Sequence, residues 1–147
     1  MNNSKSFIYS IESLDHVAEA LLFQYPLARK WALYGSMGMG KTTLIKALAK
    51  KLGSIDEGSS PTFAIANQYQ TISGLLIYHL DLFRLKSLEE AFNAGIYEII
   101  QSRDSYCFVE WPELIEEWMD EEWIKINMMS SGGNTRWMKV LSNRAVY

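Results

Sequence analysis

A run of glycines followed by a lysine and a threonine is the part of this sequence that points most directly to chemistry. Residues 35–42 read GSMGMGKT and match the pattern G-x-x-x-x-G-K-[ST] at every fixed position. Gly35, Gly38 and Gly40 allow backbone angles that other residues avoid, and they let main-chain N–H groups approach oxygen atoms closely. Converging N–H groups bind anions, and the positive end of a following helix strengthens that binding. The loop is therefore predicted to wrap a polyphosphate.

The residues at the end of the loop complete this prediction. Lys41 is expected to bridge the β- and γ-phosphates, Thr42 to hold Mg²⁺ through its hydroxyl, and Thr43 to reach the α-phosphate. The predicted nucleotide contacts from the loop and the first helical turn are Met37, Gly38, Met39, Gly40, Lys41, Thr42 and Thr43. A dinucleotide site is disfavoured, because G-x-G-x-x-G needs a further glycine that does not follow Gly40 at that spacing.

Two carboxylates at the ends of apolar segments are candidates for completing a magnesium site. Mg²⁺ prefers octahedral oxygen ligands and takes one or two carboxylates beside phosphates and waters. Glu110 ends the apolar run 106–109, as the acid of a Walker B strand does, although Asp is commoner there. Asp81 follows the segment 75–80 and can orient the attacking water or a metal-bound water. The alternative for each acid is a surface group at a strand end.

Thr62 and His79 are two further residues that the sequence singles out. Thr62 lies in SPTF, on the first long loop after the glycine-loop helix, where a switch threonine can sense the γ-phosphate. The alternative for Thr62 is an ordinary Ser-Pro-Thr turn. His79 adjoins the Asp81 segment, and a lone histidine in such a place is interpreted as a packing residue.

The elements that position these residues follow from hydrophobic periodicity. Apolar or alternating runs predict strands over residues 7–11, 30–34, 63–71, 75–82, 106–109, 123–129 and 137–141. Helical spacing and capping residues predict helices over residues 13–26, 44–52, 87–93, 97–101 and 111–118. Strands and helices alternate in the first half, whereas hairpins dominate elsewhere. We therefore predict an α/β fold, with residues 1–147 forming a single P-loop NTPase domain whose mixed sheet is flanked by helices.

Composition and charge limit the class of protein further. The 147 residues suit one domain with a substantial core, and 48% of them are hydrophobic. The formal charge of −3 argues against strong nucleic-acid binding by this chain alone, because such binding needs an excess of Lys and Arg. Cys107 is the only cysteine, so no internal disulfide can form. Because the sequence shows neither a long apolar stretch nor a signal-peptide core, we expect a soluble cytoplasmic protein without membrane contact.

Several short motifs together resemble those of the TsaE family of bacterial ATPases. GSMGMGKTT, SPTF, YHLDLFRL, an isolated glycine in AFNAGIYE, and VEWPE occur in the family's order and spacing. SPTF, HLDLFR and EWPE are together far more specific than the glycine loop alone. The chain departs from the family pattern at Met37 and Met39, where Leu and Ala are usual, and at Phe83, where Tyr is usual.

The resemblance implies a P-loop fold with Lys41 and Thr42 at ATP and Mg²⁺. It also implies Thr62 in a switch loop, Asp81 in hydrolysis and Glu110 as a Mg²⁺ ligand. Proteins of this family work with TsaB and TsaD to make threonylcarbamoyladenosine at position 37 of tRNAs that read ANN codons. The resemblance implies that the chain contacts tRNA only through that complex. It also implies that the chain hydrolyses ATP slowly on its own and faster with its partners.

The resemblance extends to two further residues, Arg136 and Trp111. The late strands of the family carry an arginine near Arg136, which implies a nucleotide contact there. Trp111 matches a family tryptophan that follows the glutamate, without an assigned role. The acidic residues between 113 and 122 are interpreted as a solvated helix face, and an interface with a basic partner is the alternative.

Other functions are compatible with the glycine loop. A small-molecule kinase generally needs an arginine-bearing lid, whereas the arginines here are scattered and no lid segment is evident. A nucleotide-gated binding module, in which hydrolysis does not matter, would be separated from an ATPase by the change Asp81→Asn. A GTPase is disfavoured because no N-K-x-D element occurs, so the choice of ATP depends on the resemblance.

Overall fold

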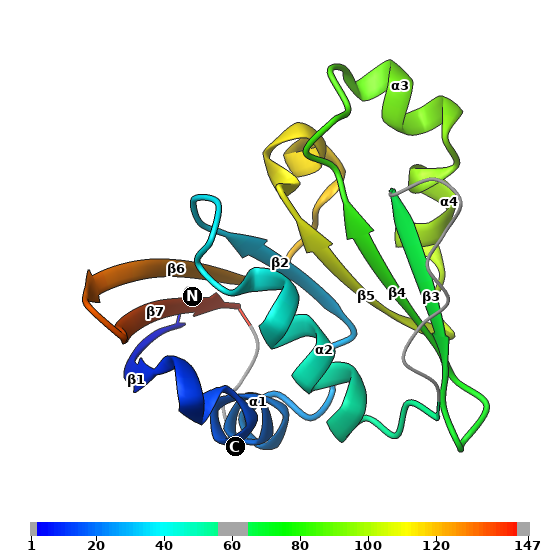
Figure 1. The fold of residues 1–147 in the computed structure, drawn as a ribbon. Helices are drawn as coiled ribbons and strands as arrows, with labels where there is room; N and C mark the ends of the chain where they lie inside the picture. Colours follow the sequence, from blue (N-terminus) through cyan, green and yellow to red (C-terminus); the bar gives the residue numbers. More distant parts are fainter. Residues whose placement is uncertain (1–2, 56–64, 144–147) are drawn as a thin grey trace.

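The computed structural model describes residues 3–55 and 65–143, which form seven strands and six helical segments (Figure 1). The strands are β1 (Asn3–Ser10), β2 (Lys30–Tyr34), β3 (Ala66–Gln70), β4 (Leu76–Asp81), β5 (Ser105–Glu110), β6 (Ile124–Gly132) and β7 (Thr135–Ser142). The α-helices are α1 (Leu14–Gln24), α2 (Lys41–Lys51), α3 (Leu88–Asn93) and α4 (Ile96–Gln101). Two 3₁₀ segments, η1 (Ile11–Ser13) and η2 (Pro112–Trp118), complete the described elements.

All seven strands belong to one mixed sheet in the order β1-β7-β6-β2-β5-β4-β3. The central strands β6, β2, β5 and β4 run parallel. At one edge β7 and β1 continue the sheet in antiparallel pairing, and β3 does so at the other edge. The predicted mixed α/β sheet flanked by helices is confirmed.

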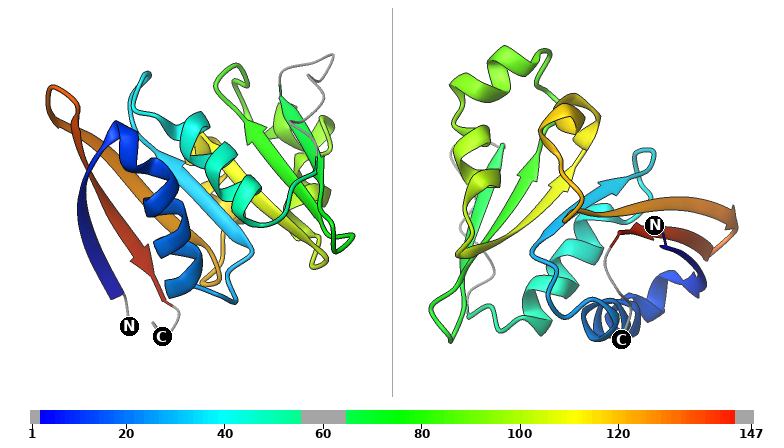
Figure 2. Two further views of the ribbon diagram at one scale, coloured as in Figure 1. Left: turned by 60° about the horizontal axis from the view of Figure 1, so that its bottom comes forward. Right: turned by 180° about the vertical axis from the view of Figure 1, so that it is seen from behind.

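Helices cover the sheet on both faces (Figure 2). The side chains of α1 and α2 pack in one core with Trp31 and Leu33 of β2. Ala32 lies between these two residues and packs in the other core, with side chains of α3, α4 and η2. Because β2 is buried on both faces, its residues from Trp31 onward form a continuous apolar run rather than an alternating one.

The parallel strands bring the chemically important residues to one edge of the sheet. β2 leads directly into the glycine loop, and its Leu33 pairs with Glu110 at the end of β5. Asp81 at the end of β4 pairs with the same Glu110 from the other side. Ligands of open α/β sheets bind at the carboxyl ends of the strands, so the site is expected at this edge.

The two largest differences from the sequence prediction are in β1 and η2. β1 begins at Asn3 instead of residue 7, because its polar first half pairs with β7 in the register Asn3↔Ser142. The helix predicted over 111–118 is a 3₁₀ segment, interrupted by a non-helical Ile115, and it starts at Pro112. Within the described residues, no helix combines the length and apolarity needed to cross a bilayer.

Candidate functional site

Three glycines shape the loop between β2 and α2. Gly35, Gly38 and Gly40 have φ angles of 151°, 84° and 95°, a region that disfavours residues with a Cβ atom. A Cβ atom at Gly35 would lie 2.9 Å from the carbonyl oxygen of Met128 on β6, whereas one at Gly38 would meet nothing within 4 Å. The loop is thus held tightly against the sheet at its start and is open in its middle.

Lys41, the first residue of α2, turns its side chain back into this loop. Its Nζ donates a hydrogen bond to the carbonyl oxygen of Gly35 at 2.5 Å and lies 3.5 Å from the centre of the Trp111 ring. Burial lowers the pKa of Lys41, while nearby carboxylates, Glu110 first among them, act in the opposite direction. The ammonium group is therefore held where phosphate oxygens can compete for it.

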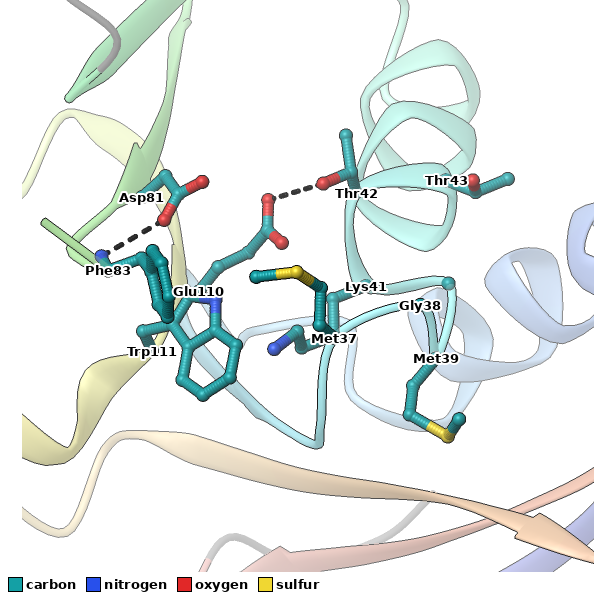
Figure 3. Close-up of a pocket in the computed structure, with 11 residues that line it drawn as sticks. Met37, Gly38, Met39, Lys41, Thr42, Thr43, Asp81, Phe83, Glu110 and Trp111 are labelled. Atoms are coloured by element: carbon teal, nitrogen blue, oxygen red, sulfur yellow. Dashed lines mark hydrogen bonds between the residues drawn. The ribbon is translucent and has the colours of Figure 1, made fainter.

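Glu110 turns its carboxylate from the end of β5 toward α2 (Figure 3). Thr42 donates a hydrogen bond from Oγ1 to Glu110 Oε2 at 2.7 Å, and His79 Nε2 lies 2.5 Å from the same oxygen. Burial alone would raise the pKa of Glu110. The hydrogen bonds from His79 and Thr42, together with the Lys41 charge, outweigh burial, so the pKa is lowered. Glu110 therefore presents an ionised carboxylate to α2.

Asp81 adds a second carboxylate at this edge. It lies beside Glu110 because β4 and β5 pair in parallel with these two residues in register. The Oδ1 atom of Asp81 accepts a hydrogen bond from the main-chain N–H of Phe83 at 3.1 Å, which fixes the turn after β4.

Trp111 has an unusual backbone conformation directly after Glu110. Its φ and ψ angles are 56° and 55°, and among the described residues it is the one non-glycine with positive φ. A left-handed conformation costs a residue with a Cβ atom about 1–2 kcal/mol. The indole ring lies over Lys41 and 4.9 Å from the ring of Phe83, centre to centre. The strained turn thus brings an aromatic wall to the glycine loop.

These groups surround one cavity of about 360 Å³ at the carboxyl ends of β2, β5 and β4 (Figure 3). Its lining residues are Met37, Gly38, Met39, Gly40, Lys41, Thr42, Thr43, Asp81, Phe83, Glu110 and Trp111. The structure therefore brings together nine of the residues that the sequence predicts for the site. Phe83 and Trp111 line the cavity in addition.

The side chains of the loop point in different directions. Met37 is exposed, whereas Met39 packs against the core beneath the loop. Thr42 and Thr43 lie on different sides of the first turn of α2, and only Thr42 faces Glu110 (Figure 3). The loop therefore lines the cavity mainly with its main chain, and this explains why it tolerates methionine at positions 37 and 39.

One residue predicted for the site, Arg136, does not line this cavity. Arg136 lies on β7, and its guanidinium donates hydrogen bonds to the carbonyl oxygens of Gly133 at 2.7 Å and Thr135 at 3.1 Å. The structure thus uses Arg136 within the β6–β7 turn and does not bring it to the glycine loop. Thr62 lies outside the residues that the structure describes.

The oxygen donors of the cavity fit a hard divalent cation bound beside phosphates. Mg²⁺ prefers hydroxyl, carboxylate and phosphate oxygens. Thr42 Oγ1 and Glu110 Oε2 are 2.7 Å apart, and Asp81 is the in-register neighbour of Glu110. The arrangement can therefore bind a polyphosphate through N–H groups and an ammonium, and a cation through neighbouring oxygens.

His79 makes a contact in the site that the sequence does not predict. The expected packing role agrees with its burial, but its ring also reaches Glu110. A signal for this contact exists, because His79 and Asp81 are two residues apart on one strand and therefore share a face.

Comparisons with known proteins identify the family of this chain. Residues 8–138 match the profile of the family described as "Threonylcarbamoyl adenosine biosynthesis protein TsaE". The tRNA threonylcarbamoyladenosine biosynthesis protein TsaE of Borreliella burgdorferi is 39% identical over 114 residues, which cover 78% of this chain and 72% of that protein. The protein of the same name from Rickettsia bellii is 31% identical over 129 residues, covering 87% and 88%.

A solved structure supports the fold independently. The crystal structure of Bacillus subtilis YdiB superposes with a TM-score of 0.70 and 26% sequence identity, covering 97% of this chain and 87% of that chain. The architecture is accordingly that of a P-loop NTPase-like α/β domain. Since the family match spans the glycine loop and both strand-end acids, this chain belongs to the TsaE family of tRNA threonylcarbamoyladenosine biosynthesis proteins.

Proposed function

We propose that this chain binds ATP with Mg²⁺ in the cavity and hydrolyses it to reset a complex of TsaB and TsaD. That complex would form threonylcarbamoyladenosine at position 37 of tRNA. The proposal of nucleotide binding rests on one observation. Lys41, Thr42 and Glu110 line the same cavity at the glycine loop. The relatives' names support the role in threonylcarbamoyladenosine biosynthesis.

The triphosphate is proposed to lie along the loop and the first turn of α2. Main-chain N–H groups of residues 37–43 donate to its oxygens, and the positive end of α2 adds to the attraction. Lys41 exchanges its bond to the neutral Gly35 carbonyl for bonds to the β- and γ-phosphates. Hydrogen bonds between charged groups are stronger than those to a neutral acceptor, so the exchange favours binding. Thr43 is the proposed contact to the α-phosphate.

Thr42 and Glu110 are proposed to hold Mg²⁺. The ion would supply charge neutralisation at the β- and γ-phosphate oxygens. The hydrogen bond of 2.7 Å between the two side chains keeps hydroxyl and carboxylate together before the ion arrives. The lowered pKa of Glu110 keeps this group ionised at neutral pH, as a metal ligand must be.

Asp81 is proposed to act on the attacking water, either by orienting it or by accepting its proton. The register between β4 and β5 holds Asp81 next to Glu110, and the hydrogen bond from Phe83 restricts its carboxylate. Thr62 is proposed to sense the terminal phosphate from the loop after α2.

An acidic surface with exposed aromatic rings supports the proposed partnership. Residues 88–101 and 112–122 hold nine of the 17 Asp and Glu residues, three in the first segment and six in the second, and none of the 14 Lys and Arg. Phe92, Tyr97 and Trp118 lie where the two segments meet, with ring centres 5.2–6.5 Å apart. Phe92 is 51% exposed and Tyr97 is 37% exposed.

We call residues 88–101 and 112–122 the acidic aromatic surface. Aromatic side chains are frequent anchors of protein interfaces, and opposite charges across an interface favour association and select the partner. The occupant that fits this surface is a protein with a basic face, and we assign it to the TsaB–TsaD complex. Of the two interpretations of the acidic residues between 113 and 122, we therefore favour an interface with a basic partner over a solvated helix face.

Three measurements test the proposal. Calorimetry should show binding of ATP in the presence of Mg²⁺. Hydrolysis should be slow for the chain alone and faster when purified TsaB and TsaD are added. Nucleoside analysis of tRNA should show that the chain restores threonylcarbamoyladenosine in a bacterium depleted of its own TsaE. Folded protein that binds no ATP at millimolar concentration would overturn the nucleotide assignment, whereas unchanged hydrolysis with TsaB and TsaD would overturn the partnership.

A further inference from the structure

We infer that His79 is the positioning residue of Glu110 and fixes its carboxylate in the orientation that Mg²⁺ requires. This inference rests on the proposed function, because it takes Glu110 as a ligand of Mg²⁺. His79 lies on β4 and shares the face of Asp81, so its ring projects toward the space between β5 and α2.

Two donors from different elements end on one oxygen of Glu110. His79 on β4 approaches Oε2 to 2.5 Å, and Thr42 on α2 approaches it to 2.7 Å. The side chains of His79 and Glu110 are only 4% and 5% exposed, so water competes little for this contact. The carboxylate is thus fixed by both the sheet and the helix, and its other oxygen acquires a defined position.

A glutamate needs such an anchor more than an aspartate does. Its side chain has one more rotatable bond, and ordering each bond costs conformational entropy. Thr42 cannot supply the anchor alone, since it is itself a proposed ligand of the ion. Removing a group that orients a metal ligand typically reduces metal affinity by about 10- to 100-fold. His79 therefore compensates for the longer side chain at the end of β5.

The hydrogen-bond roles can be assigned. A carboxylate only accepts hydrogen bonds, and Oε2 of Glu110 already accepts one from Thr42, so the proton shared with His79 belongs to Nε2 of the histidine. Within the described part of the chain, Nδ1 of His79 is buried and makes no hydrogen bond. A substitution at position 79 therefore tests the inference by keeping or removing the Nε2–H donor.

Three substitutions separate this hydrogen bond from the volume of the side chain. His79→Gln keeps a side-chain N–H near the position of Nε2. His79→Leu keeps apolar bulk without a donor, and His79→Asn keeps an amide that is too short to reach Glu110. Ile77→Val, two residues earlier on the same strand and fully buried, is the matched control for a packing change.

Calorimetry with a non-hydrolysable ATP analogue, in Mg²⁺ and in EDTA, gives the factor by which magnesium tightens binding. We expect His79→Leu and His79→Asn to reduce this factor by about tenfold or more. Binding in EDTA should stay at the wild-type level, and His79→Gln should restore most of the factor. Ile77→Val should leave it unchanged. If the leucine variant does not fold, the comparison of Asn with Gln decides.

The possible results separate this inference from the proposed function. An unchanged magnesium factor in the Leu and Asn variants overturns the inference alone. An equal loss of affinity for the analogue in EDTA and in Mg²⁺ also overturns the inference, because His79 would then act through packing. The inference is likewise wrong if Mg²⁺ tightens binding to His79→Gln no more than to His79→Leu. Wild-type binding that Mg²⁺ does not tighten removes the metal assignment of Glu110 and the inference with it. A wild-type chain that does not bind the analogue at all overturns the proposed function itself.

Discussion

At Gly35 the glycine loop passes so close to β6 that a methyl group has no room. The Cβ atom of an alanine would lie 2.9 Å from the Met128 carbonyl oxygen, at a φ angle of 151°. We predict that Gly35→Ala lowers the free energy of unfolding by about 1–3 kcal/mol and weakens ATP binding. Urea denaturation measures the first effect and calorimetry the second.

Gly74 provides the control for this prediction. It has a φ angle of 89° in the turn between β3 and β4, and a Cβ atom there meets nothing within 4 Å. Gly74→Ala should therefore cost only the backbone strain, about 1 kcal/mol, and leave ATP affinity unchanged. Equal losses in both variants would show that the contact with Met128 does not matter.

Asp81 distinguishes an ATPase from a nucleotide-gated binding module. Asp81→Asn keeps the oxygen that accepts from the Phe83 N–H but removes the negative charge. We predict that ATP affinity stays within about twofold, while the hydrolysis rate falls by about 10²- to 10⁴-fold. Steady-state kinetics and calorimetry on the same preparation measure the two quantities.

Complementation by the Asp81→Asn variant decides what hydrolysis is for. If turnover is lost and threonylcarbamoyladenosine formation in a TsaE-depleted bacterium is also lost, hydrolysis is required. If formation persists without turnover, the chain acts as a binding module, and the proposed resetting role is wrong.

The sequence predicts the acids of the cavity better than it predicts their neighbours. Glu110 and Asp81 each end an apolar run, so their position at the strand ends follows from the pattern. The bond between His79 and Glu110 depends on the order in which β4 and β5 pair, and a single sequence does not encode that order locally. Trp111 matches a tryptophan of the family pattern, but its place over Lys41 arises from a strained turn without a sequence signature.

At the scale of elements, a buried lysine connects β2 to the end of α4. Lys30 is 8% exposed, and its Nζ donates to the carbonyl oxygens of Ile100 and Ser102, each at 2.5 Å. Lys30→Met keeps the chain length but leaves both carbonyls without this donor. We predict a loss of about 1–3 kcal/mol in the free energy of unfolding, measured by denaturant titration.

Lys46 is the matched control for the change at Lys30. It lies on the exposed face of α2, and Lys46→Met should change stability by no more than about 0.5 kcal/mol. The role assigned to Lys30 is wrong if Lys30→Met is as stable as the wild type.

Some elements follow from sequence and others do not. The predicted strand over 30–34 has the bounds of β2, because four of its five residues form the apolar run expected of a strand buried on both faces. The start of β1 is missed, since its first residues are polar and are held by pairing with β7 alone. The pattern of 111–118 locates η2 but not its 3₁₀ geometry, because the left-handed Trp111 sets the entry of the chain.

At the scale of the molecule, charge is distributed unevenly, and this leads to a prediction about association. If the acidic aromatic surface binds TsaB–TsaD, the triple change of Glu89, Glu117 and Glu121 to Lys should weaken binding by about tenfold or more at low salt. Wild-type binding should weaken as salt is added, because exposed charges are screened. Biolayer interferometry with immobilised TsaB–TsaD measures both effects.

A second triple variant controls for net charge. Glu12, Asp15 and Asp104 are exposed and lie outside the acidic aromatic surface, so changing them to Lys alters the total charge equally. This variant should bind TsaB–TsaD like the wild type, and both variants should keep their ATP affinity. Similar weakening in the two variants would place the contact elsewhere.

The pairing of the first strand with the last has a consequence for how the chain can be connected. Asn3 pairs with Ser142, so these two residues are far apart in sequence but adjacent in space. Figure 1 shows β1 beside β7 at one edge of the sheet. In a circular permutant, a short linker would therefore join the end of β7 to the start of β1, and the new termini would lie in the turn at Ser73. The strands β2, β5 and β4 would keep their neighbours, so the nucleotide cavity should survive a complete change in the order of synthesis.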